Sequence, residues 1–75
     1  MLEEAEIALA RAELHVMEAR GRRFDQLEKI ALLKSQGRYT SEAEQTLGLF
    51  EAYLLIVERH RDFLVRSKLP STPQR

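Results

Sequence analysis

Hydrophobic residues in the first half of the chain recur every three or four positions, which is the spacing of one face of an α-helix. The periodic segment covers about residues 2–36, and Gly37 follows it, where helices commonly end with a left-handed glycine. The pattern therefore predicts one long helix over about 2–36. The face expected to pack against the rest of the protein comprises Leu2, Ala5, Leu9, Ala12, Val16, Phe24, Leu27, Ile30 and Ala31.

A second helix is predicted over about residues 41–68. The segment Ser41-Glu42-Ala43-Glu44 fits a capping box, and Thr40 is by residue type an equally suitable cap. A core stripe follows at heptad spacing with one charged interruption: Ala43, Leu47, Phe50, Leu54, Val57, Arg61 and Leu64. A second stripe runs beside it: Leu49, Tyr53, Ile56, His60 and Phe63. At about 100° per residue the two stripes span roughly half of the helix circumference, so part of that surface should face another chain.

Residues 37–40 form the predicted turn between the helices. The expected fold class is therefore all-α, an antiparallel helical hairpin that occupies residues 1–69 as one domain. Residues 70–75 contain Pro70 and Pro73, which cannot continue a helix, and are predicted to form a flexible tail. A chain of 75 residues lies near the size at which a single core struggles to stabilise a fold. We therefore expect a homodimer in which two hairpins form a four-helix bundle.

Composition narrows the classes of partner. Twelve Lys and Arg residues balance twelve Asp and Glu residues, so no net charge attracts nucleic acid or anionic lipid. The chain opens with acidic residues and contains neither a signal-like apolar segment nor an apolar run of membrane length, which predicts a cytoplasmic protein with no membrane partner. The absence of cysteine excludes disulfides, a thiol nucleophile and a thiolate metal site.

No sequence motif indicates catalysis. The chain has no Gly-rich phosphate loop and no Ser, His and Asp set that a two-helix hairpin could bring together, so we expect neither enzyme activity nor a cofactor. The expected function is a protein-interaction or scaffolding module that self-associates through apolar helix faces, with any further protein partner left open. Its predicted interaction surface comprises Leu49, Tyr53, Ile56, His60, Phe63, Ala8, Ala12 and Ala19. The three alanines permit close approach of another helix, although alanine is also the best helix former.

A belt of arginines near the middle of the hairpin supports an alternative function, a nucleic-acid or phosphate-binding accessory protein. The belt comprises Arg20, Arg22, Arg23, Arg59 and Arg61. Glu18, Asp25, Glu58 and Asp62 lie at the same level and favour a salt-bridged, solvated surface instead. A DNA-binding helix-turn-helix would need shorter helices, a third helix and an exposed basic recognition helix, none of which the sequence predicts.

Two histidines support a third alternative, a metal-binding bundle. His15 and His60 are predicted to lie on facing helices, but neither has a Glu three residues before it, as dimetal bundles require. We therefore expect them to be ordinary histidines at the edge of the helix interface. The tail also fits a Pro-x-x-Pro ligand with Arg75 nearby, a match that short sequences often produce by chance.

The pattern Gly37-x-x-Thr40-x-x-Ala43-x-x-x-Leu47-x-x-Phe50, followed by Arg61-Asp62-x-Leu64, resembles a set of short uncharacterised bacterial proteins of hairpin type. Gln26, Glu28, Ile30, Ala31 and Leu33 belong to the same likeness, which covers about two thirds of the chain. Members often carry His-Asp at the turn and more arginine on the second helix, where this chain has Arg38-Tyr39 and Leu54-Leu55-Ile56. The resemblance implies a hairpin fold and no activity, and the departures from the pattern suggest a version that is more apolar and self-associates more strongly than those proteins.

Overall fold

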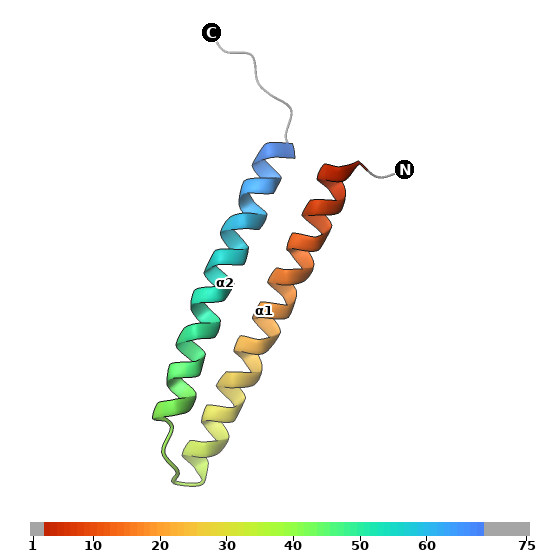
Figure 1. The fold of residues 1–75 in the computed structure, drawn as a ribbon. Coiled ribbons are helices and arrows are strands. Elements are labelled where there is room, and N and C mark those ends of the chain that lie inside the picture. The colour runs from red at the N-terminus through yellow and green to blue at the C-terminus, as the bar shows by residue number, and fades with distance from the viewer. Residues whose placement is uncertain (1–2, 69–75) are drawn as a thin grey trace.

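The computed structural model describes residues 3–68 and contains two helices, α1 (Glu4–Ser35) and α2 (Ser41–Lys68). Figure 1 shows them side by side and antiparallel, joined by one short turn. The predicted all-α antiparallel hairpin is confirmed. The predicted start of the first helix at Leu2, the tail over residues 70–75 and its Pro-x-x-Pro motif lie outside the described residues.

Two backbone hydrogen bonds to the last carbonyl groups of α1 form the turn. The N–H of Gly37 donates to the carbonyl of Lys34, and the N–H of Arg38 donates to the carbonyl of Leu33, both at 3.0 Å. This pair of bonds is a Schellman motif, which requires a left-handed residue directly after the helix cap. Gly37 has φ 68°, as predicted, and the chain reverses there because glycine has no Cβ to oppose that conformation.

Helix α2 begins at Ser41, as predicted, but its capping residue lies one position before the predicted capping box. The N–H of Glu44 donates to the carbonyl of Thr40 at 2.8 Å, so Thr40 is the capping residue and Ser41 already belongs to the helix. The hydroxyl of Thr40 also donates to the Glu44 carboxylate at 2.9 Å. The capping box at Ser41 is therefore wrong, and the alternative cap, Thr40, holds this position.

The core stripe of α2 packs against α1 as predicted. Ala43 and Val57 are buried, and the other five members are partly buried. Val57 forms a cluster with Val16 and Ala19 of α1, and Leu54 packs against that cluster. Residues at heptad spacing on one helix therefore meet small residues on the other, which is the packing of a two-stranded coiled coil.

The seam of α1 differs from the predicted one at Ala5, which is exposed, and throughout its second half. Phe24 and Leu27 are 58% and 38% exposed, and Ala31 is exposed too, whereas Gln26 is buried. The seam instead follows heptad spacing, with the exposed Arg23 as the one interruption: Leu9, Ala12, Val16, Ala19, Arg23, Gln26, Ile30 and Leu33. A straight helix drifts about 20° per heptad away from such a seam. After two or three heptads the predicted face of α1 therefore no longer coincides with the face that contacts α2.

The resulting core contains few large side chains. Among residues 3–68 the buried hydrophobic residues are Ala12, Val16, Ala19, Ile30, Ala43 and Val57, and half of these are alanines. Small side chains allow the two helices to approach closely, but each removes little apolar surface from water. Most of the larger hydrophobic residues lie outside this core.

Candidate interaction surface

The five residues of the second predicted stripe lie together on the exposed side of α2. We call them the outer stripe: Leu49, Tyr53, Ile56, His60 and Phe63. Leu49 is 71% exposed, Ile56 64%, Phe63 58% and Tyr53 43%. The structure thus brings all five onto one surface and leaves their apolar area open to solvent.

The outer stripe is uncovered because of its angular position on α2. Each member directly precedes a residue of the core stripe, as Ile56 precedes Val57, and is therefore rotated by about 100° from the face that α1 covers. One antiparallel helix covers one heptad seam, so it cannot reach both stripes. The two-stripe pattern of α2 consequently leaves a ready contact surface for a further helix.

The predicted alanine strip lies differently. Ala12 and Ala19 are each 2% exposed, and Ala19 belongs to the cluster with Val57, while Ala8 is partly buried. The close approach that these alanines permit is used by α2 of the same chain. Ala12 and Ala19 are therefore not available as an interaction surface for another chain.

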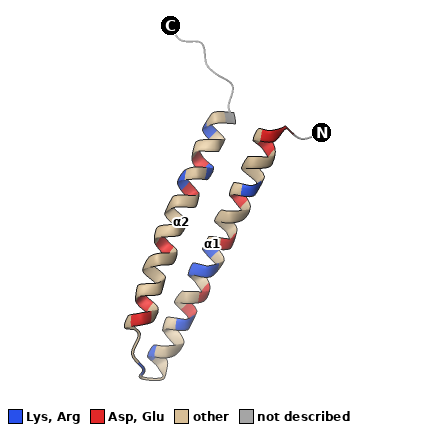
Figure 2. Cartoon of the chain, in the orientation of Figure 1, with Lys and Arg blue, Asp and Glu red and all other residues tan. Residues whose placement is uncertain are grey.

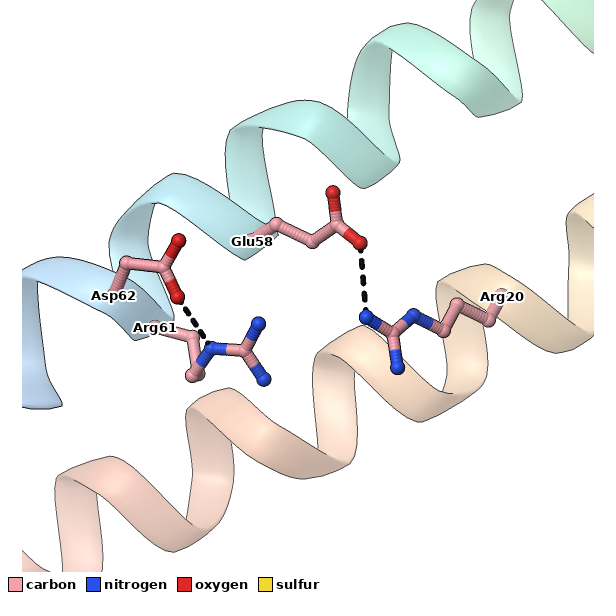
Figure 3. Close-up of polar contacts among 4 residues, drawn as sticks. All are labelled: Arg20, Glu58, Arg61 and Asp62. Atoms are coloured by element: carbon pink, nitrogen blue, oxygen red, sulfur yellow. Dashed lines mark hydrogen bonds and ion pairs between the residues drawn. The ribbon is translucent and has the colours of Figure 1, made fainter.

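Ion pairs across the two helices join two of the belt arginines to α2. Arg20 pairs with Glu58 and Arg23 pairs with Glu51, both at 3.1 Å. Figure 3 shows the first of these pairs bridging the helices. Both pairs are substantially exposed, and such pairs contribute only about 0.2–1 kcal/mol each. Their main effect is to neutralise two members of the belt.

Arg61 interrupts the core stripe and is held by its neighbour on the same helix. Its Nε donates to Oδ1 of Asp62 at 2.7 Å, and its side chain is 24% exposed (Figure 3). This hydrogen bond raises the pKa of the Arg61 guanidinium above its ordinary value, and the charges of Asp62, Glu13 and Glu58 act in the same direction. The carboxylate partner of Arg61 thus lies on α2 itself, one residue along the chain.

Gln26 is the residue that the hydrophobic pattern did not identify. It is the one buried polar residue among residues 3–68, and its Nε2 donates to the carbonyl of Ala43 at 2.9 Å. It lies at a heptad position between Ala19 and Ile30, so strict seven-residue counting could have placed it in the seam. Its hydrogen bond ties the C-terminal part of α1 to the first turn of α2.

Neither histidine is enclosed. His15 and His60 are both exposed, and within residues 3–68 no group of three His, Cys, Asp or Glu side chains is placed to hold a metal ion. A shallow, polar hollow of about 310 Å³ lies beside the turn, lined in part by Gln26, Lys29 and Arg38. The Gln26 amide there already donates to Ala43, so this hollow offers no buried free donor that would select a ligand.

Comparison of the chain with protein-family models, with curated proteins and with solved structures finds no match in any of the three. In the part of the chain that the structure describes, neither helix is long and apolar enough to cross a membrane. The class that the fold defines is thus a two-helix antiparallel hairpin.

Proposed function

We propose that this protein is a non-catalytic self-association module that pairs through the outer stripe of α2 and so forms a four-helix bundle. The observation that supports this proposal is the exposure of Leu49, Ile56 and Phe63 in one continuous stripe, beside a core that contains few large residues. Contiguous apolar surface of this kind on a small protein commonly marks an interaction site.

The area of the outer stripe is large enough to contribute most of an interface. With about 200 Å² for each large side chain, the exposed fractions of its four apolar members correspond to roughly 450–500 Å² per copy. Two copies would remove roughly twice that area from water, close to the lower end of specific interfaces at about 1,000–1,200 Å². His60 and the residues that border the stripe would supply the remainder.

The arginine belt supports the nucleic-acid alternative less well. Arg20, Arg23 and Arg61 each already contact a carboxylate, so three of its five members are partly neutralised. Phosphate binding by the belt would have to compete with these contacts. Apolar association through α2 requires no such rearrangement.

Light scattering coupled to size-exclusion chromatography tests the proposal. We expect the protein at micromolar concentration to have twice the monomer mass of 8.7 kDa, and we expect Ile56→Glu to shift it to the monomer. Leu55→Glu is the matched control, because Leu55 is 48% exposed and lies beside Ile56 but outside the stripe. It should leave the dimer intact.

Salt separates self-association from phosphate binding. Apolar pairing should persist as the salt concentration rises, whereas binding to a phosphate backbone weakens steeply. A wild-type protein that remains a folded monomer at these concentrations would refute the proposed function. Salt-sensitive binding to RNA or DNA by such a monomer would support the arginine-belt alternative in its place.

A further inference from the structure

The order of residues in the outer stripe is nearly the same when it is read in either direction. Ile56 lies at the centre, Leu49 and Phe63 lie seven residues to either side, and Tyr53 and His60 lie three residues before and four after it. The stripe thus has an apolar residue at each end and an aliphatic residue in the middle. Between the middle and each end lies one ring that carries a polar group, Tyr53 on one side and His60 on the other. A two-fold interface requires such a self-complementary surface, because residue i contacts residue j and residue j contacts residue i.

We infer that two copies pair through α2 in antiparallel orientation, with Ile56 of each copy meeting at the two-fold axis. This inference rests on the proposed function and specifies the geometry of the pairing. Tyr53 of one copy then lies against His60 of the other, and Leu49 lies against Phe63. The Tyr53 hydroxyl donates to the neutral imidazole, so both polar tips keep a hydrogen-bond partner when the stripe is covered.

The distribution of charge along α2 favours the antiparallel orientation over the parallel one. From Gln45 to Val57 the helix carries a single charged residue, Glu51, whereas five charged residues lie between Glu58 and Arg66. Figure 2 shows this mostly tan part of α2, with one acidic segment within it, and the more densely charged part that follows. Antiparallel pairing sets the charged half of one copy against the uncharged half of the other.

Two arginines border the outer stripe, and the antiparallel orientation sets both of them level with uncharged residues. Arg59 and Arg66 each lie three residues after a stripe member and are exposed. In the antiparallel pair Arg59 lies level with Tyr53 and Arg66 lies level with Thr46, so both face uncharged residues.

Disulfide cross-linking tests this register directly, because the protein contains no cysteine. A disulfide forms only where two Cα atoms approach within about 4.4–6.8 Å. We expect Ile56→Cys to form a covalent dimer under mild oxidation, whereas Tyr53→Cys and His60→Cys should each remain uncrosslinked alone and crosslink when the two variants are mixed. Leu55→Cys is the control and should give several-fold less covalent dimer than Ile56→Cys.

A second pair keeps the inference testable if Ile56→Cys weakens association. Mixed Leu49→Cys and Phe63→Cys chains should crosslink with each other, and neither should crosslink with itself. Covalent dimers of Tyr53→Cys alone in a protein of dimer mass would mean parallel pairing and would overturn the inference while leaving the proposed function standing.

Two other outcomes are equally decisive. A dimer that crosslinks at none of these positions would mean that the outer stripe is not the interface, and masses that keep rising with concentration would mean an open chain of head-to-tail contacts. Both overturn the two-fold pairing, and the first also shows that the self-association of the proposed function uses a surface other than the outer stripe. A monomer by light scattering would instead refute the proposed function itself.

Discussion

Replacing glycine by alanine should have opposite effects on stability at the turn and within the helices, although all three glycines of the chain have equally open surroundings. Gly21 lies within α1, Gly48 lies within α2, and Gly37 forms the turn with φ 68°. A Cβ added at any of the three meets no atom within 4 Å. Glycine to alanine therefore tests backbone conformation alone, free of steric clashes.

The expected magnitudes follow from that conformation. At Gly37 a left-handed residue with a Cβ costs about 1–2 kcal/mol, offset in part by about 0.4–1 kcal/mol because alanine is less free than glycine in the unfolded chain. Gly37→Ala should therefore destabilise the protein by up to about 1.6 kcal/mol. Gly21→Ala and Gly48→Ala should each stabilise it by about 0.5–1 kcal/mol, since glycine is unfavourable within a helix.

Thermal unfolding followed by circular dichroism measures these changes. A change of 1 kcal/mol shifts the midpoint of a domain this small by about 4–8 °C. All variants should be compared at one protein concentration, because association makes the midpoint depend on concentration. We expect a lower midpoint for Gly37→Ala and higher midpoints for the two helix variants.

A rise in the midpoint of Gly37→Ala, similar to that of the other two, would refute the argument. It would mean that residues 35–41 form a continuous helix in solution and that the two helices join into one rod. The same apolar stripes could then pair only between chains.

Two further predictions concern the helix interface. Leu54→Ala should destabilise the protein by about 2 kcal/mol, the lower end of the range for core leucines, because Leu54 is only partly buried. Leu55→Ala is the control and should cost much less. Equal losses of unfolding free energy for the two variants, measured in urea, would show that the core stripe is misassigned. Gln26→Leu should leave the free energy of unfolding nearly unchanged, because the Ala43 carbonyl lies within α2 and keeps its helical hydrogen-bond partner. Gln26→Glu should destabilise the protein by about 1–3 kcal/mol, because it sets a carboxylate against that carbonyl. A large loss in Gln26→Leu would instead make the amide hydrogen bond essential.

Local patterns along the chain were sufficient to predict the hairpin. The two periodic segments, the glycine after the first and the capping residues before the second specify helix, turn and helix, since each depends only on residues a few positions apart. The core stripe of α2 and the exposed outer stripe also follow from spacing within one helix. In the structure the core stripe packs against α1 and the outer stripe is exposed, as predicted.

The tertiary structure decided which face of α1 meets α2. Phe24 and Leu27 match the periodicity of a straight helix as well as Gln26 matches the heptad, and their greater hydrophobicity favoured them in the sequence. Packing against a second long helix selects the heptad, because only a seam repeating every 3.5 residues stays in contact along the whole interface. For the same reason Arg20 and Arg23 find their carboxylate partners on α2, and Ala12 and Ala19 are buried within the hairpin. These contacts depend on the relative rotation and offset of two helices, which no single segment of sequence contains.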